Sequence, residues 1–154
     1  MAPRTDKLVI VDIEATCWED NAAHISDIIE IGGVILDIET LDVTDTFDYL
    51  VKPTQSEVSK FCTDLTTITP GMVENAMSYT EACHLLRKQA KNFVWGSWGD
   101  YDRNIILQQC KREGVPYPFG PSHINIKTLE AIMSRRKKGV GMSNALETLG
   151  LTLE

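Results

Sequence analysis

The sequence has no apolar run that approaches the roughly 18 residues of a membrane span. Near the N-terminus it carries charges at Arg4, Asp6 and Lys7, and no hydrophobic signal-peptide core follows them. Both absences argue against the membrane-spanning and secreted classes of protein. We therefore expect an intracellular, cytoplasmic protein with no membrane partner.

Cysteine is scarce and scattered. The four cysteines, Cys17, Cys62, Cys83 and Cys110, stand at wide, irregular spacings and include no C-x-x-C pair. This spacing argues against a zinc knuckle and against a dithiol redox motif. We expect reduced thiols, most of them buried.

Positive charge is also in short supply. The 15 Lys and Arg residues face 22 Asp and Glu residues, so the net charge is −7. A protein that coats nucleic acid through bulk charge has the opposite sign, so any contact with nucleic acid must be local. The one concentrated basic run is Arg135, Arg136, Lys137 and Lys138. It is either a solvated helix C-terminus, which the helix dipole favours, or a loop that contacts phosphates.

The chain is long enough to bury one sizeable core. It has 154 residues with 43% hydrophobic side chains, and we expect a single domain, 1–154. Hydrophobic patterns and turn signals predict strands at 7–14, 28–36, 43–52, 93–98 and 124–126. This order predicts an α/β protein with a mixed five-stranded sheet flanked by helices.

Four helices are expected from their start and stop signals. A capping box of Ser78 and Glu81 opens one, and another runs from about Asp102 to a stop at Gly114. Thr128 is the expected cap of the third helix, and either Ser143 or Asn144 that of the fourth.

Two carboxylates, Asp12 and Glu14, interrupt an apolar run near the N-terminus. Side chains alternate along a strand, so both acids share one face. Like charges on a mostly hydrophobic strand repel each other and resist burial, and a divalent cation compensates them. Oxygen ligands suit Mg²⁺ or Mn²⁺, and two such ions about 4 Å apart promote phosphoryl displacement. The alternative is a salt-bridged or edge-exposed strand without a metal.

A third acid, Asp102, stands where a predicted strand gives way to a predicted helix. Such a position is exposed near the open edge of a sheet, and it makes Asp102 our candidate for the third ligand. A helix N-cap is the alternative role, and the two roles are compatible. Asp100 is the rival ligand: the Gly99-Asp100 pair also suits a turn, and sequence order does not separate the two acids.

Four segments together resemble the DEDDh 3′-to-5′ exonucleases, which share the ribonuclease-H-like fold. Asp12-Ile13-Glu14-Ala15-Thr16-Cys17 is similar to their first motif, and Ile28-Ile29-Glu30-Ile31-Gly32 to their second strand. Gly99-Asp100-Tyr101-Asp102 resembles their second motif, in which the second Asp is the ligand. Phe61-Cys62-Thr63-Asp64-Leu65-Thr66-Thr67-Ile68-Thr69 matches the F-C-x-x-L-T-x-I-T segment of one subgroup. That subgroup contains the "enhanced RNAi" exonucleases and bacterial proteins of the sporulation-inhibitor type, and the similarity extends over nearly the whole chain.

The resemblance implies a two-metal exonuclease that hydrolyses phosphodiester bonds from the 3′ end of RNA. DNA is a second candidate substrate, and the product is a nucleoside 5′-monophosphate. Asp12, Glu14 and Asp102 are implied to hold two Mg²⁺ or Mn²⁺ ions.

The resemblance also implies where the substrate binds. The Glu14–Ala15 backbone meets the terminal ribose, Thr16 is a further substrate-binding residue, and Phe61, Leu65, and Tyr101 or Trp98 form the pocket for the last base. Aromatic faces stack on any base for about 1 to 3 kcal/mol, which suits an enzyme that removes successive nucleotides. Spacing alone equally allows Phe61 and Leu65 to pack as a short amphipathic turn. We assign Glu30 a structural role near the site and place Trp95 in the core.

The family completes its site with an H-x-x-x-x-D motif that supplies the general base and the fourth metal ligand. No Asp follows five residues after His24, His84 or His123. The segment 144–151 resembles the stretch that precedes this motif, so we expect a domain truncated at its C-terminus. The alternative function is a protein-interaction module of the same fold, catalytically weak or inactive, with a protein partner.

Overall fold

The computed structural model of the chain describes residues 2–20, 23–90 and 92–152. In chain order its elements are β1 (Arg4–Ala15), β2 (Ile28–Asp37), β3 (Val43–Leu50), α1 (Lys60–Thr66), α2 (Pro70–Glu74), α3 (Tyr79–Ala90), β4 (Phe93–Ser97), α4 (Tyr101–Glu113), β5 (His123–Asn125), α5 (Ile126–Met133) and α6 (Met142–Thr148). Among the described residues, no helix has both the length and the hydropathy that a membrane crossing needs.

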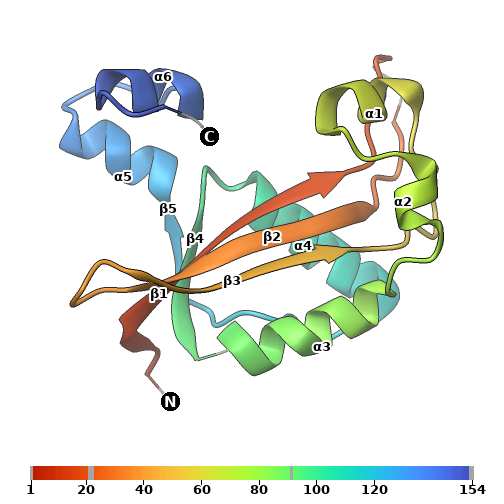
Figure 1. The fold of residues 1–154 in the computed structure, drawn as a ribbon, viewed down its shortest axis with the longest axis horizontal. Helices are drawn as coiled ribbons and strands as arrows, with labels where there is room; N and C mark the ends of the chain where they lie inside the picture. The colour runs from red at the N-terminus through yellow and green to blue at the C-terminus, as the bar shows by residue number, and fades with distance from the viewer. Residues whose placement is uncertain (1, 21–22, 91, 153–154) are drawn as a thin grey trace.

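The five strands form one sheet in the order β3-β2-β1-β4-β5 (Figure 1). β2 pairs antiparallel with both β1 and β3, whereas β4 pairs parallel with both β1 and β5. The mixed five-stranded sheet predicted from the sequence is therefore confirmed, and each predicted strand overlaps an observed one.

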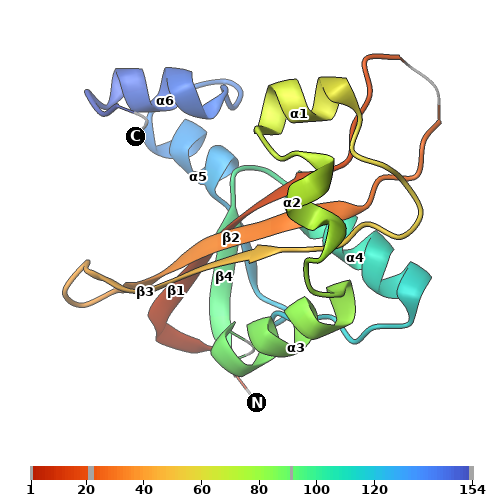
Figure 2. The same cartoon turned by 45° about the vertical axis from the view of Figure 1, so that its right-hand side comes forward.

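One face of the sheet is closed by α3 and α4; in Figures 1 and 2, α3 lies below the strands, whereas α4 lies behind their right-hand part. Val9, Val11 and Ile13 alternate along β1 and are buried in one cluster with apolar side chains of both helices. Trp95 of β4 is fully buried in the same cluster, as predicted. Full burial of side chains of this size contributes roughly 1.5–3 kcal/mol each, so this face holds the core.

The predicted capping box at the start of α3 and the predicted end of α4 at Gly114 are confirmed. Glu81 Oε2 accepts the backbone N–H of Ser78 at 2.8 Å, and Ser78 Oγ accepts the N–H of Glu81 at 3.2 Å. These reciprocal bonds form the capping box. α4 ends at Gly114, whose φ of 67° is a left-handed conformation that glycine adopts at little cost.

The predicted caps of the last two helices are wrong. Asn125 caps α5, and its side chain accepts the N–H of Thr128 at 2.9 Å, so Thr128 lies inside the helix. Gly141 precedes α6 and leaves Ser143 and Asn144 within it. The cause for α5 is that the helix follows β5 without a loop, so it begins earlier than the sequence signal indicates.

The short helices α1 and α2 are not predicted from the sequence. α1 begins after Ser59, whose hydroxyl accepts the N–H of Cys62 at 2.9 Å, and Cys62 is fully buried. α2 begins with Pro70 directly after Thr69. Helices this short depend on caps and tertiary packing, because they have too few turns to show a hydrophobic period.

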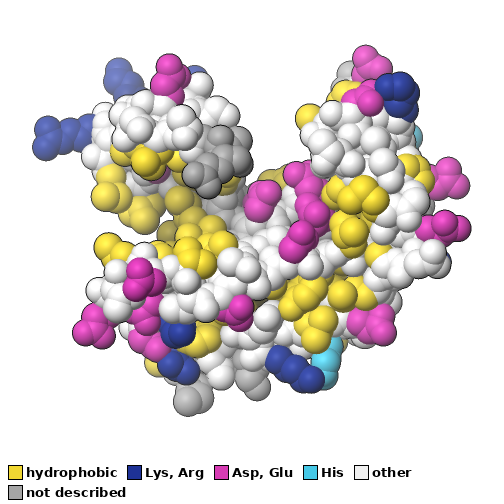
Figure 3. Space-filling model, viewed as in Figure 1, with side chains coloured by type: hydrophobic (Ala, Val, Ile, Leu, Met, Phe, Trp, Pro, Cys, Tyr) yellow, Lys and Arg dark blue, Asp and Glu magenta, His cyan; other side chains and the backbone are white. Residues whose placement is uncertain are grey.

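The other face of the sheet is open and hollowed. Figure 3 shows the hollow between the part that carries α1 and α2 and the part that carries α5 and α6, with acidic side chains gathered at its floor. Of the predicted acidic residues, Asp12 and Glu14 lie on β1 and Asp102 lies in the first turn of α4.

Candidate active site

Asp12 and Glu14 both project from β1 into the hollow. Their neighbours Val11, Ile13 and Ala15 are buried on the opposite face, as a strand period of two requires. In the register of the sheet, Asp12 stands opposite Gly32 of β2, which has no side chain to cover it. The structure thus places the two acids on one open face.

Asp102 joins these acids from the first turn of α4. Its side chain is only 4% exposed, and its Oδ1 accepts the backbone N–H of Ile13 at 3.1 Å. Ile13 lies between Asp12 and Glu14 in the sequence, so this bond holds the third carboxylate beside the other two. The interpretation of Asp102 as an N-cap is wrong, because the N-cap position is Asp100.

The rival acid Asp100 turns to other partners. Its Oδ2 accepts a hydrogen bond from the side-chain amide of Asn125 at 2.8 Å. Its Oδ1 lies 3.5 Å from the guanidinium of Arg103 and 3.8 Å from Nδ1 of His123. The structure therefore distinguishes Asp100 from Asp102, whereas sequence order alone does not.

The pKa of each of the three acids is raised. Burial is the largest cause for each, and the charges of Asp12, Glu30 and Asp102 add to it for Glu14. The charge of Asp12 likewise raises the pKa of Asp102, which the Ile13 N–H partly offsets. No Lys or Arg is among the groups that shift these pKa values. The negative charge of this face is therefore uncompensated by the described side chains.

The donor set fits a hard divalent cation. Carboxylate oxygens are the ligands that Mg²⁺ and Mn²⁺ prefer, and a cation removes the repulsion that raises these pKa values. Among the described residues, no three Asp, Glu, His or Cys side chains converge tightly enough to enclose an ion. Asp12, Glu14 and Asp102 thus form an open set of donors.

Two further acids share this face. Glu30 stands opposite Glu14, and Asp48 stands opposite Gly32, across the strands β1, β2 and β3. Burial, followed by the charges of Asp48 and Asp12, raises the pKa of Glu30. Asp48 was not predicted from the sequence, because its place opposite Gly32 depends on the register between β2 and β3.

An apolar rim flanks the acids at the end of β1. Phe61 and Leu65, one helical turn apart on α1, are 40% and 67% exposed. α1 is tied to the chain after β1, because Ser59 Oγ donates to the carbonyl of Cys17 at 2.7 Å and Cys62 Sγ to that of Ala15 at 3.6 Å. These two side chains therefore lie beside the acid face and remain free to contact a ligand.

Tyr101 lies on the side of α4. It begins the helix one residue before Asp102 and is 61% exposed. Burial raises its pKa most, followed by the charges of Cys17, Asp102 and Glu14. Trp98 is half-buried between β4 and α4. The structure thus brings Tyr101 to the acids.

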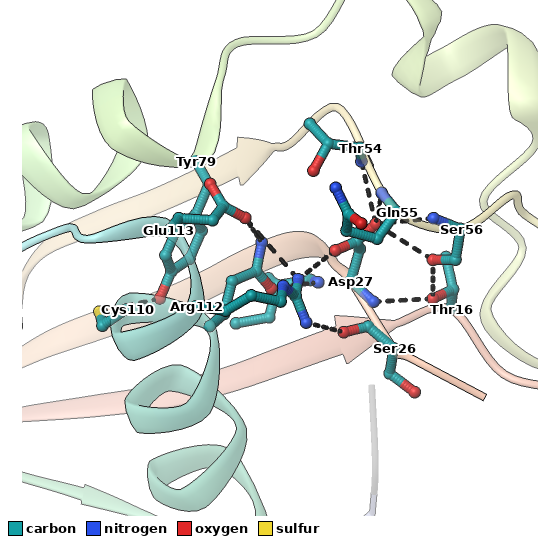
Figure 4. A network of polar contacts seen from close by, with 12 residues as sticks. Thr16, Ser26, Asp27, Thr54, Gln55, Ser56, Tyr79, Cys110, Arg112 and Glu113 are labelled. Atoms are coloured by element: carbon teal, nitrogen blue, oxygen red, sulfur yellow. Dashed lines mark hydrogen bonds and ion pairs between the residues drawn. The ribbon is translucent and has the colours of Figure 1, made fainter. Parts of the chain in front are cut away.

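The Thr16 side chain is engaged within the protein. It is 1% exposed, its Oγ1 accepts the N–H of Asp27 at 2.9 Å, and it shares a hydrogen bond with Ser56 Oγ at 2.7 Å. Figure 4 shows these side chains facing one another. These bonds give the Thr16 hydroxyl a structural role, and the substrate contact that the family motif implied stays a prediction.

Asp27 is the centre of this polar network. Its fully buried carboxylate accepts the N–H groups of Thr54, Gln55 and Ser56 and pairs with the guanidinium of Arg112. The network fixes the segment after β3 against α4 and the end of β1 (Figure 4). It therefore supports the backbone that follows Glu14.

The basic run lies beyond the end of α5. Arg135, Lys137 and Lys138 are exposed, whereas Arg136 is half-buried and pairs with Glu130 at 2.8 Å. The pair with Glu130 engages one side of the Arg136 guanidinium, and the phosphate contact expected of Arg136 stays a prediction. The other three cations remain free for a phosphate.

None of the three histidines is among the groups that shift the pKa of the three acids. His24 stacks on Trp18, His84 is exposed on α3, and His123 contacts Ser97. The geometry therefore agrees with the absence of the H-x-x-x-x-D motif from the sequence.

Comparisons with known proteins match this arrangement. Residues 9–153 fit the family model of the RNase_T exonucleases. Human ERI1 exoribonuclease 2 is 29% identical over 173 residues, which cover 95% of this chain and 25% of that protein. Rat 3′-5′ exoribonuclease 1 is 33% identical over 134 residues, which cover 79% of this chain and 39% of that protein. The chain therefore spans less than half the length of these relatives.

A solved structure gives the same result for the fold. The nuclease domain of 3′hExo, a DEDDh family member bound to rAMP, is 27% identical with a TM-score of 0.84, over 100% of this chain and 84% of that one. The sheet and its acid face are thus the ribonuclease-H-like fold of the DEDDh nucleases. The chain belongs to the RNase_T exonuclease family, among its ERI1-like members, and the resemblance drawn from the motifs is confirmed.

Removal of one acid tests the repulsion on this face. Burial raises the pKa of Asp12, so its charged form opposes folding at neutral pH. We expect Asp12→Asn to raise the melting temperature without metal and to abolish the stabilisation that Mn²⁺ gives. Thermal unfolding with EDTA and with Mn²⁺ measures both. Asp45→Asn, an exposed position on β3, is the matched control and should leave the Mn²⁺ effect unchanged; equal Mn²⁺ stabilisation in both variants would contradict the assignment.

The Asp27 network yields a stability prediction. Arg112→Met leaves the fully buried Asp27 carboxylate without its cation, and we expect a loss of about 3 kcal/mol of unfolding free energy in urea denaturation. Lys60→Met is the control, because its pair with Asp64 is exposed and contributes little. An Arg112→Met variant as stable as the Lys60→Met control would show that the network does not stabilise the fold.

Proposed function

We propose that the chain is a metal-dependent 3′-to-5′ exonuclease that removes nucleotides from the 3′ end of RNA. The observation that carries the proposal is the bond between Asp102 and the Ile13 N–H, which seats a third acid beside Asp12 and Glu14. Support comes from relatives named as exoribonucleases and from similar structures described as bound to rAMP and as recognising a histone mRNA stem-loop.

In this proposal Asp12, Glu14 and Asp102 hold two Mg²⁺ or Mn²⁺ ions. Such ions, when bound, stabilise the charge that develops on the attacking and leaving oxygens of the phosphodiester. The protein's part is to keep the three carboxylates together on one face against their own repulsion. The buried core behind β1 and the Asp102 bond supply that constraint.

The rim is proposed to bind the last nucleotide. Phe61 and Leu65 on one side and Tyr101 or Trp98 on the other present apolar surfaces that stack on any base. The backbone at Glu14 and Ala15 lies between these surfaces and the acids and is proposed to meet the terminal ribose. This arrangement would bind a 3′ end independently of its base sequence. DNA ends are candidate substrates as well.

Water activation is not assigned to a residue of this chain. No Asp follows five residues after any of the three histidines, and general-base help is worth about 10² to 10⁴ in rate. We therefore expect slow hydrolysis by this chain.

We also propose a reducing, intracellular location, since Cys17, Cys62, Cys83 and Cys110 are free.

A time course on 5′-labelled single-stranded RNA with Mn²⁺ tests the function. We expect a ladder that shortens from the 3′ end and slows by more than about 100-fold in Asp12→Ala, because removal of a ligand costs more than removal of an outer-shell partner. Asp100→Asn is the matched control, because Asp100 points to Asn125 and keeps that bond as an amide. RNA that stays intact with the unaltered chain over the whole time course would refute the proposed activity.

The exposed cations after α5 are proposed to contact phosphates. Replacing Arg135, Lys137 and Lys138 with serine should weaken binding of all RNA sequences alike and make its salt dependence shallower by about 0.7 for each phosphate that is no longer neutralised. Fluorescence anisotropy with EDTA, over a range of salt concentrations, measures this change. The control is the double variant Lys88→Ser with Lys111→Ser, on the helices of the opposite face. The same salt slope in both variants would show that the basic run is a solvated segment without phosphate contacts.

A further inference from the structure

A groove of about 430 Å³ runs beside α4, and none of the acids of the hollow lines it. One wall is an exposed side of α4, and the other is the segment that leads into β2. Its volume lies within the range of about 300 to 1,000 Å³ that is typical of small-molecule sites. We call it the α4 groove. Its lining includes Tyr101, Asn104 and Gln108 on α4 and His24, Ile25 and Ser26 on the segment before β2.

The α4 wall presents free polar side chains. Tyr101, Asn104 and Gln108 are three and four positions apart, so they share one side of the helix and extend about 10 Å along its axis. All three are exposed, and within the described part of the chain no hydrogen bond engages the side-chain amides of Asn104 and Gln108. An amide offers both donors and an acceptor, so this wall can bind sugar hydroxyls or base edges.

The opposite wall is fixed to α4 before any ligand binds. The Arg112 guanidinium donates to the carbonyl of Ser26 at 3.2 Å and pairs with the buried Asp27 (Figure 4). On this wall Ile25 is 54% exposed, and the ring of His24 stacks on another aromatic ring. The wall therefore offers aliphatic and aromatic surface, which binds bases of any kind.

Tyr101 connects the α4 groove with the proposed site of the terminal nucleotide. It lines the groove and precedes Asp102 by one residue, and it is 61% exposed. An aromatic ring has two faces, and each can stack on a base. A strand that leaves the acids past Tyr101 therefore enters a groove whose lining carries no acid; Asp20, which reaches His24, is paired with it at 2.7 Å.

We propose that the α4 groove binds the nucleotide next to the 3′-terminal one, with the ring of Tyr101 between the two bases. The inference rests on the proposed function, which places the terminal base between Tyr101 and the apolar residues of α1. Asn104 and Gln108 then hydrogen-bond the second nucleotide, and Ile25 packs on its base. The site consequently holds two successive nucleotides, and a dinucleotide binds more tightly than a mononucleotide.

Isothermal titration calorimetry with Mn²⁺ tests this without an activity assay. The ligands are adenosine 5′-monophosphate and an adenosine dinucleotide in which a methylene group replaces the bridging 3′ oxygen, so that it is not cleaved there. We expect the unaltered chain to bind the dinucleotide about 5- to 150-fold more tightly, because one more stacked base is worth about 1 to 3 kcal/mol.

Variants locate the second nucleotide. Asn104→Ala with Gln108→Ala should weaken dinucleotide binding by about 10-fold and leave the affinity for the monophosphate unchanged. Tyr101→Ala should weaken both ligands, and the dinucleotide by the larger factor, since the ring then loses two bases. Leu107→Ala, an exposed position of α4 outside the groove, is the matched control and should bind both ligands as the unaltered chain does.

The two levels of the proposal fail in different ways. If the unaltered chain binds neither ligand, the proposed function fails and this inference fails with it. If the monophosphate binds but the dinucleotide binds no more tightly, or if the double variant keeps the full difference, the inference alone is overturned. Thermal unfolding checks that the double variant is folded, which we expect because alanine is the most favourable residue in a helix.

Discussion

The hydrogen bond from the Ile13 N–H to Asp102 Oδ1 is the contact on which the candidate site depends. It joins the first turn of α4 to the one strand that carries two acids on its open face. Strand β1 is central in the sheet and pairs with both β2 and β4, so its backbone is rigid. A donor fixed in this way places the Asp102 carboxylate more precisely than a loop contact could, because neither partner moves independently of the core.

The same arrangement costs stability in the absence of a cation. Burial raises the pKa of Asp12, Glu14 and Asp102, neighbouring acids raise the pKa of Glu14 and Asp102 further, and Glu30 and Asp48 add negative charge on neighbouring strands. No described side chain of opposite charge shifts these values, so the hydrophobic burial behind β1 and the Asp27 network must offset the repulsion. A folded chain that tolerates this face is therefore poised to gain stability from a divalent ion.

The sequence allowed the sheet and the shared face of Asp12 and Glu14 to be predicted, because a strand period of two is a local property. The position of Asp102 at the strand-to-helix junction and the family resemblance favoured it over Asp100, but the residues alone left the choice open, since it depends on where α4 begins and which side chain meets β1. The buried contacts of Thr16 with Asp27 and Ser56 could not be predicted, because these partners lie 11 and 40 residues away in the sequence.

The distribution of charge around the hollow limits how an RNA end can be held there. The floor is acidic, the rim is apolar, and the free cations of the basic run lie beyond the end of α5. In the proposed function, a phosphate approaches these five carboxylates only with cations between them, so we expect metal and nucleic acid to bind together. Affinity for the end would then come from stacking on the rim and from the bound ions, and only a small part from side-chain charge. This division would reconcile a net charge of −7 with binding of a polyanion at one point of the surface.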